Sequence, residues 1–269
     1  MPPKQIRRIL NRALRLALKA SGKKQIFVEL FSGSGTLARQ VQIVSGFHCV
    51  QFDLAKGPAF NVTDQTVLNM LMGWIGARVI RGVWAGFPCT TWSMARYPPL
   101  RSNASPWGLP HQLEVPRSAE QIKVGNATLR AAARVANACL RASTPCVLEN
   151  PHGAMSWGAP PMRRLQLQPN VEQVVCDYCC FGMPWRKRTR LVGVACSAAP
   201  ALQRRCTAKR GLCSTGKPHL TLRGTKPGTN VLWTRIAEPY PRKMARAAAQ
   251  WLVRAADNQQ LHFMQSLVI

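Results

Sequence analysis

The chain has 269 residues, of which 46% are hydrophobic and 17% are charged, so it can bury one sizeable core or a core plus a small lobe. This composition excludes a disordered tail. Its 37 Lys and Arg residues outnumber its 10 Asp and Glu residues. The formal net charge of +27 favours a polyanionic partner, such as nucleic acid or an acidic membrane surface, over a small metabolite.

The sequence favours a soluble, intracellular protein without a membrane partner. Arginines interrupt every long apolar run, so no stretch approaches the roughly 20 apolar residues that span a bilayer. The first residues also lack the apolar region and cleavage site of a signal peptide. Ten cysteines are too few for a disulfide scaffold, and most follow Glu172, which is typical of metal or catalytic chemistry in a reducing compartment. We expect a monomer in the nucleus or nucleoid.

Residues 1–24 are predicted to contain a basic amphipathic helix over 4–20. One helical face carries arginines and a lysine, and the other is apolar. Three interpretations fit this composition: a first helix packed on the domain, an organelle-targeting segment, or a nucleic-acid-binding arm.

From residue 25 the pattern predicts alternating strands and helices, and therefore a largely parallel α/β sheet with its sites at the carboxyl ends of the strands. The expected strands are 26–30, 48–54, 78–88 and 145–151, and the expected helices are 33–44 and 119–142. We place a catalytic domain at 25–197, a small basic target-recognition region at 198–237, and a returning helix within 238–269. Residues 178–237 contain no Asp or Glu but twelve basic residues, which favours contact with phosphates.

A glycine turn follows the first expected strand. Gly33 and Gly35 allow the backbone to approach a ligand closely, at the start of a helix whose N–H groups face it. Asp53, at the end of the second strand, can accept hydrogen bonds from two ribose hydroxyls. The pattern favours a nucleoside-type cofactor, and a purely structural turn is the alternative.

Two further strand ends carry reactive groups. Cys89 follows the third strand, and Glu149 ends the fourth strand ahead of Asn150. A thiol and a carboxyl group at neighbouring strand ends can converge on one substrate, the thiol attacking while the carboxyl group activates a ring nitrogen. A strand beginning near Arg188 and Arg190 follows.

These motifs resemble those of the DNA cytosine-5 methyltransferase family. FSGSG, FPCTTWS, LENP and RTRL occur in the order and approximate spacing of that family, and EPYPRKMARAAAQWL is similar to its closing helix. The resemblance spans roughly residues 25–253. The ENP variant and the short chain are closer to phage, mobile-element or protist members than to large maintenance enzymes.

The resemblance implies a Rossmann-like domain that binds S-adenosylmethionine. It implies that Phe31, Gly33 and Gly35 shape the cofactor pocket, that Glu29 lies near the amino-acid end of the cofactor, and that Asp53 takes the ribose. Asn61 stands where the family usually has an acid near the adenine, and Asp64 is a candidate substitute.

The resemblance also implies the chemistry. Cys89 attacks C6 of a flipped-out cytosine, Glu149 shares a proton with N3, and Arg190 with Arg188 faces the base O2 and the carboxylate. The loop 93–115 closes over the base. The residues expected to contact substrate are Ser93, Arg96, Arg101, Asn150, Arg186, Lys187, Arg204 and Arg205.

Two departures from the family pattern stand near the base pocket. Trp185, Arg186 and Lys187 fill, with an apparent extra residue, the space where the family commonly has a glutamine before its arginine pair. Pro151 replaces an aliphatic residue. The predicted reaction is methylation of cytosine C5 in DNA. The alternatives are the same chemistry on RNA cytosine of the transfer-RNA type, and a catalytically silent nucleic-acid-binding protein on this fold.

A cysteine cluster lies outside these motifs. Its spacing is consistent with four ligands to a structural zinc, although thiols without metal are the more frequent case for such spacing. The candidate ligands are Cys176, Cys179, Cys206, Cys213 and His219. Cys180 competes with Cys179 for the second position.

Overall fold

A computed structural model describes residues 1–208, 212–214 and 216–266 of the chain. Six strands form one sheet in the order β2-β1-β3-β4-β6-β5. The neighbours β1 (Ile26–Leu30), β2 (Cys49–Phe52), β3 (Ile80–Gly86) and β4 (Cys146–Pro151) pair in parallel, whereas β6 (Arg188–Val194) runs antiparallel between β4 and β5 (Val171–Asp177). This mostly parallel sheet confirms the predicted Rossmann-like α/β fold.

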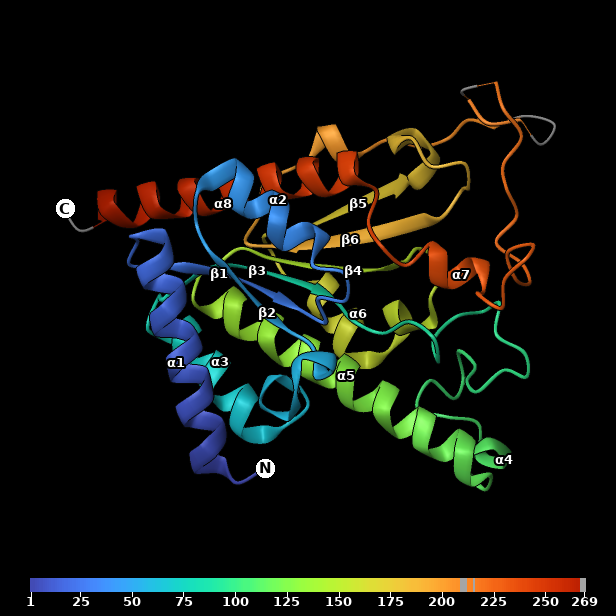
Figure 1. Cartoon of the computed structure of the whole chain (residues 1–269), viewed down its shortest axis with the longest axis horizontal. Coiled ribbons are helices and arrows are strands. Elements are labelled where there is room, and N and C mark those ends of the chain that lie inside the picture. Colours follow the sequence, from blue (N-terminus) through green and yellow to red (C-terminus); the bar gives the residue numbers. More distant parts are fainter. Residues whose placement is uncertain (209–211, 215, 267–269) are drawn as a thin grey trace.

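Helices cover both faces of the sheet, as Figure 1 shows. On one face lie α1 (Pro3–Ser21), α3 (Gln65–Gly76), α5 (Pro116–Arg141) and α6 (Pro160–Gln166). On the other lie α2 (Thr36–Ser45) and α8 (Arg242–Ser266), which pack against each other. Among the described residues, no helix has the length and hydropathy needed to cross a membrane.

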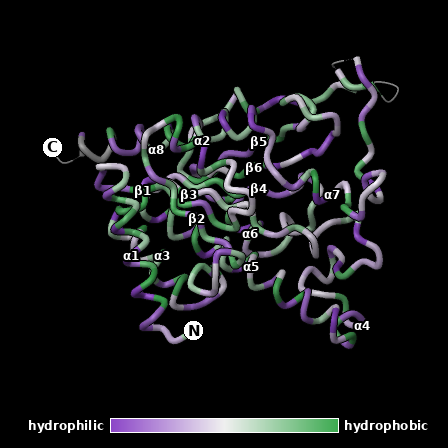
Figure 2. The backbone as a smooth tube through the Cα atoms, in the orientation of Figure 1, coloured by the Kyte–Doolittle hydropathy of each residue, from purple (hydrophilic) through white to green (hydrophobic). Residues whose placement is uncertain are grey.

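Successive side chains of each strand point to opposite faces of the sheet, with a period of two residues. In β1, Ile26, Val28 and Leu30 join the core beneath α1, α3 and α5, whereas Phe27 joins the core beneath α2 and α8. All five residues of β1 are buried, because helices cover both of its faces. In Figure 2 the central strands are accordingly hydrophobic, whereas α1 alternates between hydrophobic and hydrophilic residues.

Short elements connect these layers. They are α4 (Pro110–Leu113), α7 (Trp233–Ile236), and the 3-10 turns η1 (Leu54–Lys56), η2 (Pro58–Phe60), η3 (Met155–Gly158), η4 (Tyr178–Phe181) and η5 (Pro200–Leu202). Between η5 and α7 the described residues form isolated bridges, Leu212 with Pro218 and Thr225 with Leu232. Most of their side chains are exposed, and this basic segment extends away from the sheet (Figure 1).

The N-terminal helix α1 packs on the domain. Ile6, Leu10 and Ala17 are buried, and α1 contacts α3 and η2. Arg12 and the other arginines of α1 are directed away from this contact and are exposed or partly exposed. This packing favours the first of the three interpretations, in which α1 is an integral part of the fold.

Replacing Leu10 by Ala should therefore lower the free energy of unfolding by about 2–5 kcal/mol, because the side chain is fully enclosed. Arg12→Ala, a matched change on the exposed face of the same helix, should alter it by less than about 0.5 kcal/mol. Urea unfolding monitored by circular dichroism measures both. Equal effects of the two changes would contradict the packing of α1 on the core.

Candidate functional site

The predicted site residues gather at the carboxyl edge of the sheet. Strands β1 to β4 run parallel, and β5 runs in the same direction because it pairs antiparallel with β6, itself antiparallel to β4. Their carboxyl ends therefore share one edge, where open α/β sheets bind ligands. Along this edge follow the glycine turn after β1, Asp53 after β2, Cys89 after β3, Glu149 in β4 and the turn η4 after β5.

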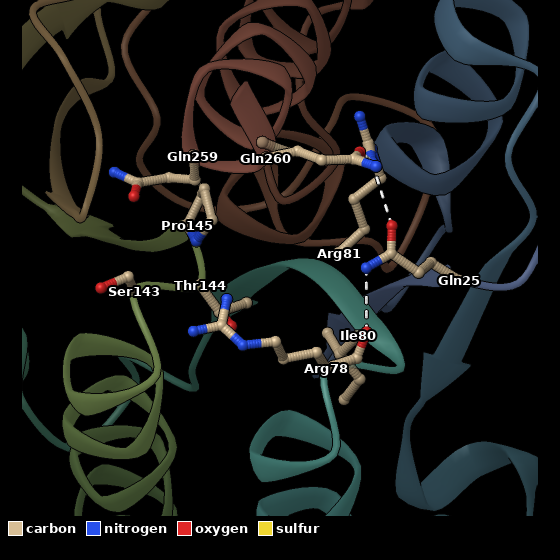
Figure 3. A pocket seen from close by; sticks show the side chains of 10 residues that line it. Gln25, Arg78, Ile80, Arg81, Ser143, Thr144, Pro145, Gln259 and Gln260 are labelled. Carbon is tan, nitrogen blue, oxygen red and sulfur yellow. Dashed lines mark hydrogen bonds between the residues drawn. The ribbon is translucent and has the colours of Figure 1, made fainter. Parts of the chain in front are cut away.

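A cavity of about 230 Å³ lies at the opposite edge (Figure 3). Its lining comes from residues before β1 and β4, from the start of β3 and from the second half of α8. Gln25 there donates to the backbone oxygen of Arg78 at 2.9 Å and accepts from Arg81 at 3.0 Å. The lining includes no thiol and no carboxyl group.

The turn after β1 depends on left-handed backbone. Phe31, Gly33 and Gly35 have φ values of 55°, 45° and 63°. A Cβ at Gly35 would lie 2.5 Å from the Gln51 side-chain oxygen, which would have to move, and the left-handed φ of this position favours glycine. A Cβ at Gly33 would meet nothing within 4 Å, which leaves open space above the exposed turn.

Two acids hold this turn in place. Asp53 accepts hydrogen bonds from the N–H groups of Gly33 and Ala55, each at 2.9 Å. Glu29 accepts from the N–H group of Ala38 at 3.0 Å and is 1% exposed. Burial raises the pKa of Glu29 to about 7. Glu29 therefore supports the first turn of α2 from below, and its carboxyl group is enclosed rather than presented to a ligand.

The two residues predicted near an adenine have local partners. Asn61 accepts hydrogen bonds from the backbone and hydroxyl groups of Thr63. Asp64 accepts from the N–H groups of Thr66 and Val67 and so caps α3. Both are partly exposed at the carboxyl edge, but the Asp64 carboxylate is engaged in capping α3.

Cys89 and Glu149 converge, as the motif order predicts. Glu149 pairs with Gly86 in the β3–β4 register, and Cys89 lies three residues beyond Gly86. Cys89 is partly exposed, and burial, followed by the negative charge of Glu149, raises the pKa of its thiol, whereas the positive charge of Lys187 lowers it. The carboxyl group of Glu149 and the ammonium group of Lys187 therefore lie close enough to Cys89 for their charges to act on its thiol.

Glu149 is held by two hydroxyl groups that the motifs do not reveal. One of its oxygens accepts a hydrogen bond from the Thr189 hydroxyl group, and the other accepts from Tyr240 at 3.1 Å. Tyr240 in turn accepts from the indole N–H group of Trp84 at 3.0 Å. Gly86 makes room for this arrangement, because a Cβ there would lie 2.1 Å from the Tyr240 hydroxyl oxygen.

Arg188 and Arg190 do not join Glu149, which differs from the expectation. Thr189 points to the α2 and α8 face, so its two neighbours in β6 point to the other face. Arg188 there donates two hydrogen bonds of 2.9 Å to Asp177. Arg190 lies against Trp157 and donates to Gln166 at 3.2 Å. Because side chains alternate along the strand, Lys187 shares the face of Thr189. Of these three basic residues, Lys187 is the one whose positive charge lowers the pKa of the Cys89 thiol.

Asn150 is fully buried and positions the loop that carries Cys89. Its amide group donates to the backbone oxygen of Phe87 at 2.7 Å, and its oxygen is 3.2 Å from the Ser156 hydroxyl. Its amide nitrogen and oxygen are thus engaged by protein groups, which differs from the predicted contact with substrate. Asn150 acts instead as a clamp between the ends of β3 and β4.

The loop 93–115 is anchored to α5. Arg101, predicted to contact substrate, is 2% exposed and lies 3.7 Å above the ring of Trp92. Its guanidinium group donates to backbone and side-chain oxygens of Thr91, Pro106, Ile122 and Asn126. Burial lowers its pKa to about 10. The structure therefore assigns Arg101 to the loop's own framework.

The other residues predicted to contact substrate differ in accessibility. Ser93 caps a turn at Ala95, and Arg96 is partly buried and donates to Gln121. Arg186, Arg204 and Arg205 are exposed beside the end of β5. Arg186 lies 3.6 Å from Asp177, so part of its charge is compensated.

Four candidate metal ligands come together, and a fifth does not. The ligand atoms of Cys179, Cys206, Cys213 and His219 all lie within 4.8 Å of one another. Cys176, predicted as the first ligand, is buried in β5 within the core beneath α8 and lies outside this group. The predicted spacing of two residues between ligands is therefore wrong, and Cys179 alone represents the first pair.

No protein-family model matches the sequence, and the search of curated proteins returns no match. Among solved structures, the chain is similar to a methyltransferase of Entamoeba histolytica, EhMeth, with 11% identity and a TM-score of 0.37. That similarity covers 92% of this chain and 100% of the Entamoeba chain. These low values leave the interpretation of the site to its own geometry.

The electrostatics of Cys89 can be tested by alkylation. Because its pKa is raised above the ordinary thiol value, its reaction with iodoacetamide should be slow at neutral pH and accelerate as the pH rises. Glu149→Gln removes the negative charge and should speed the reaction at neutral pH, and Lys187→Met should slow it. Mass spectrometry of the Cys89 peptide gives each rate. Identical rates in the wild type, Glu149→Gln and Lys187→Met would show that neither charged group acts on the Cys89 thiol.

The framework role of Arg101 predicts a loss of stability. Arg101→Met leaves several buried oxygens without a donor and should lower the free energy of unfolding by about 2–4 kcal/mol. Arg117→Met, an exposed position on α5, is the matched control and should change it by less than about 0.5 kcal/mol. Urea unfolding compares the two variants. An unchanged free energy of unfolding in Arg101→Met would contradict the framework role and leave Arg101 as a candidate phosphate contact.

Proposed function

We propose that this protein is a methyltransferase that transfers a methyl group from S-adenosylmethionine to C5 of cytosine in DNA. The observation that carries the proposal is the convergence of the Cys89 thiol with the Glu149 carboxyl group at adjacent strand ends. Cytosine C5 is not nucleophilic by itself, and a thiol attacking C6 together with an acid at N3 is the pair of groups that activates it. The resemblance of the motifs supports the same assignment.

Residues at the ends of β1 and β2 fit the proposed cofactor. The hydroxyl oxygen of Ser32 is buried at the glycine turn without a hydrogen-bond partner, and the N-cap residue of α2, Gly35, has no side chain that could cap the helix. The exposed Gly33 and the Asp53 carboxylate beside it offer further groups to a nucleoside and an amino-acid moiety. When bound, the cofactor supplies an electrophilic methyl group. We assign its contacts to the Phe31–Gly35 turn and Asp53, with Glu29 as a support beneath them.

In the proposed reaction Cys89 loses its proton and its sulfur bonds to C6 of the base. Electron density then rises at C5, which accepts the methyl group, and loss of the C5 proton releases the thiolate. Glu149 lies where it can share a proton with N3, held by Thr189 and Tyr240. The raised pKa of Cys89 means that the thiolate forms at a cost in the free protein, and Lys187 lowers that cost.

The charge distribution supports a nucleic acid as substrate. The target atom of cytosine is inaccessible within a duplex, so the base must leave the stack to reach Cys89. The exposed Arg204 and Arg205 lie beside the end of β5, on the same edge of the sheet, in a stretch without acids. We assign the phosphate contacts to this segment.

The proposal is tested with oligonucleotides that carry 5-fluorocytosine. Fluorine cannot leave C5 as the proton does, so protein, methylated base and oligonucleotide should accumulate as a covalent complex that survives denaturation. Duplex DNA, single-stranded DNA and transfer RNA are compared, with S-adenosylmethionine present or omitted. We expect trapping on DNA, dependent on the cofactor.

Variants identify the atoms involved. Cys89→Ala should abolish trapping and methyl transfer yet bind S-adenosylmethionine, because the glycine turn is separate from the thiol. Cys49→Ala, a buried cysteine in β2, is the matched control and should trap normally. Trapping on transfer RNA alone would replace DNA by RNA as substrate. Normal methylation by Cys89→Ala would overturn the mechanism, and nucleic-acid binding without methylation would favour a silent binding protein.

A further inference from the structure

Among the described residues between η5 and α7, the buried side chains are two cysteines, which form a cluster of sulfur ligands. Cys206 and Cys213 are 6% and 7% exposed, and they contact Cys179 of η4. His219 closes the group, and each of the four residues offers one ligand atom. Most other described side chains of this segment are exposed, so little apolar packing fixes the segment against the sheet.

The distances agree with a tetrahedral metal site. The sulfur atoms of Cys206 and Cys213 are 3.7 Å apart, and the Cys206 sulfur is 3.6 Å from Nε2 of His219. Tetrahedral zinc with Zn–S bonds of about 2.3 Å and Zn–N bonds of about 2.0 Å separates its ligands by about 3.8 Å and 3.5 Å, respectively. A disulfide instead requires an S–S distance of about 2 Å.

Neighbouring groups stabilise Cys206 in this position. The Asp177 carboxylate, which is fully buried, accepts a hydrogen bond from the Cys206 N–H group at 2.8 Å. The N–H group of Ser214 is directed at the Cys206 sulfur at 3.5 Å. Such hydrogen bonds around the ligands orient them and tune the metal.

The surrounding charge also suits a metal thiolate. Three thiolates and one Zn²⁺ leave a net charge of about −1, which needs compensation when it is buried. Arg188 forms a bidentate pair with Asp177, and Arg186 lies 3.6 Å from the same carboxylate, so two cations face one anion beside the cluster. Arg188 therefore lies beside the cysteine cluster, bound to Asp177, and is not part of the Glu149 site.

We propose that Cys179, Cys206, Cys213 and His219 bind one structural zinc ion, which fixes the basic segment 198–237 at the carboxyl edge of the sheet. The ligands join η4, directly after β5, to three points of a segment whose described residues form no apolar core of their own. Soft thiolates with one imidazole in tetrahedral geometry favour zinc over hard cations such as magnesium or calcium. This site is independent of the methyl-transfer chemistry.

The full-length protein, purified under reducing conditions without added metal, should contain about one zinc per chain by mass spectrometry of the metal. Cys213→Ser and Cys179→Ser should weaken zinc binding by more than about 100-fold in competition with a chromophoric chelator. Cys180→Ser and Cys176→Ala are the matched controls, since these cysteines adjoin the site but lie outside it, and they should retain the metal.

Two measurements keep the test decisive if a ligand variant does not fold. Cobalt(II) substituted into the wild-type protein should give the intense visible absorption of a tetrahedral thiolate site. Removal of zinc by a chelator should speed tryptic cleavage within 204–226 at least tenfold, while cleavage of the sheet is unchanged. Three results would overturn the proposal. They are wild-type protein without metal, a disulfide between Cys206 and Cys213, and a loss of zinc in Cys180→Ser equal to the loss in Cys179→Ser.

Discussion

The organisation of the carboxyl edge depends on the two-residue period of the strands. In β4 and β6 this period places Glu149 and Thr189 on the α2 and α8 face, where Tyr240 completes the hydrogen bonds of the carboxylate. The same period turns Arg188 and Arg190 to the other face. One sheet thus separates a site for a thiol and a carboxyl group from a second cluster built around Asp177, and a slip of one residue would exchange them.

The sequence predicts the strands and helices that carry repeated apolar patterns. It predicts β1 to β4, α2 and α5 with boundary shifts of a few residues, because each is a long apolar or amphipathic run between glycine and proline turns. It misses β5, whose residues Glu172 and Gln173 are exposed at the sheet edge and interrupt the apolar pattern. The convergence of Cys89 and Glu149 follows from their positions at neighbouring strand ends.

The contacts that sequence reasoning misassigns are those that depend on burial. An arginine in a loop near a proposed nucleic-acid site is expected to contact phosphate. The guanidinium group of Arg101 instead donates its hydrogen bonds to backbone oxygens in and around that loop. Asn150 similarly joins two strand ends. The hydroxyl groups of Thr189 and Tyr240 carry no motif signal of their own, because only three-dimensional pairing brings them to Glu149. The cysteine spacing fails for the same reason, since the turn η4 presents Cys179 and leaves Cys176 in the core.

Under the proposed function, the side-chain alternation of β6 also accounts for the apparent extra residue before the arginine pair. If Lys187 and Thr189, rather than Arg188 and Arg190, are the pair that faces the proposed base pocket, no insertion is needed, and Trp185 stands where the motif that the sequence resembles has a glutamine. Lys187 then supplies a compact positive charge near Cys89, whereas a guanidinium group would offer a planar pair of donors. Thr189 supplies a hydroxyl group that binds Glu149 without neutralising it. A pocket built this way relies on hydrogen bonds more than on a second cation to hold its carboxylate, and it leaves Arg188 to balance the buried Asp177 at the base of the basic segment.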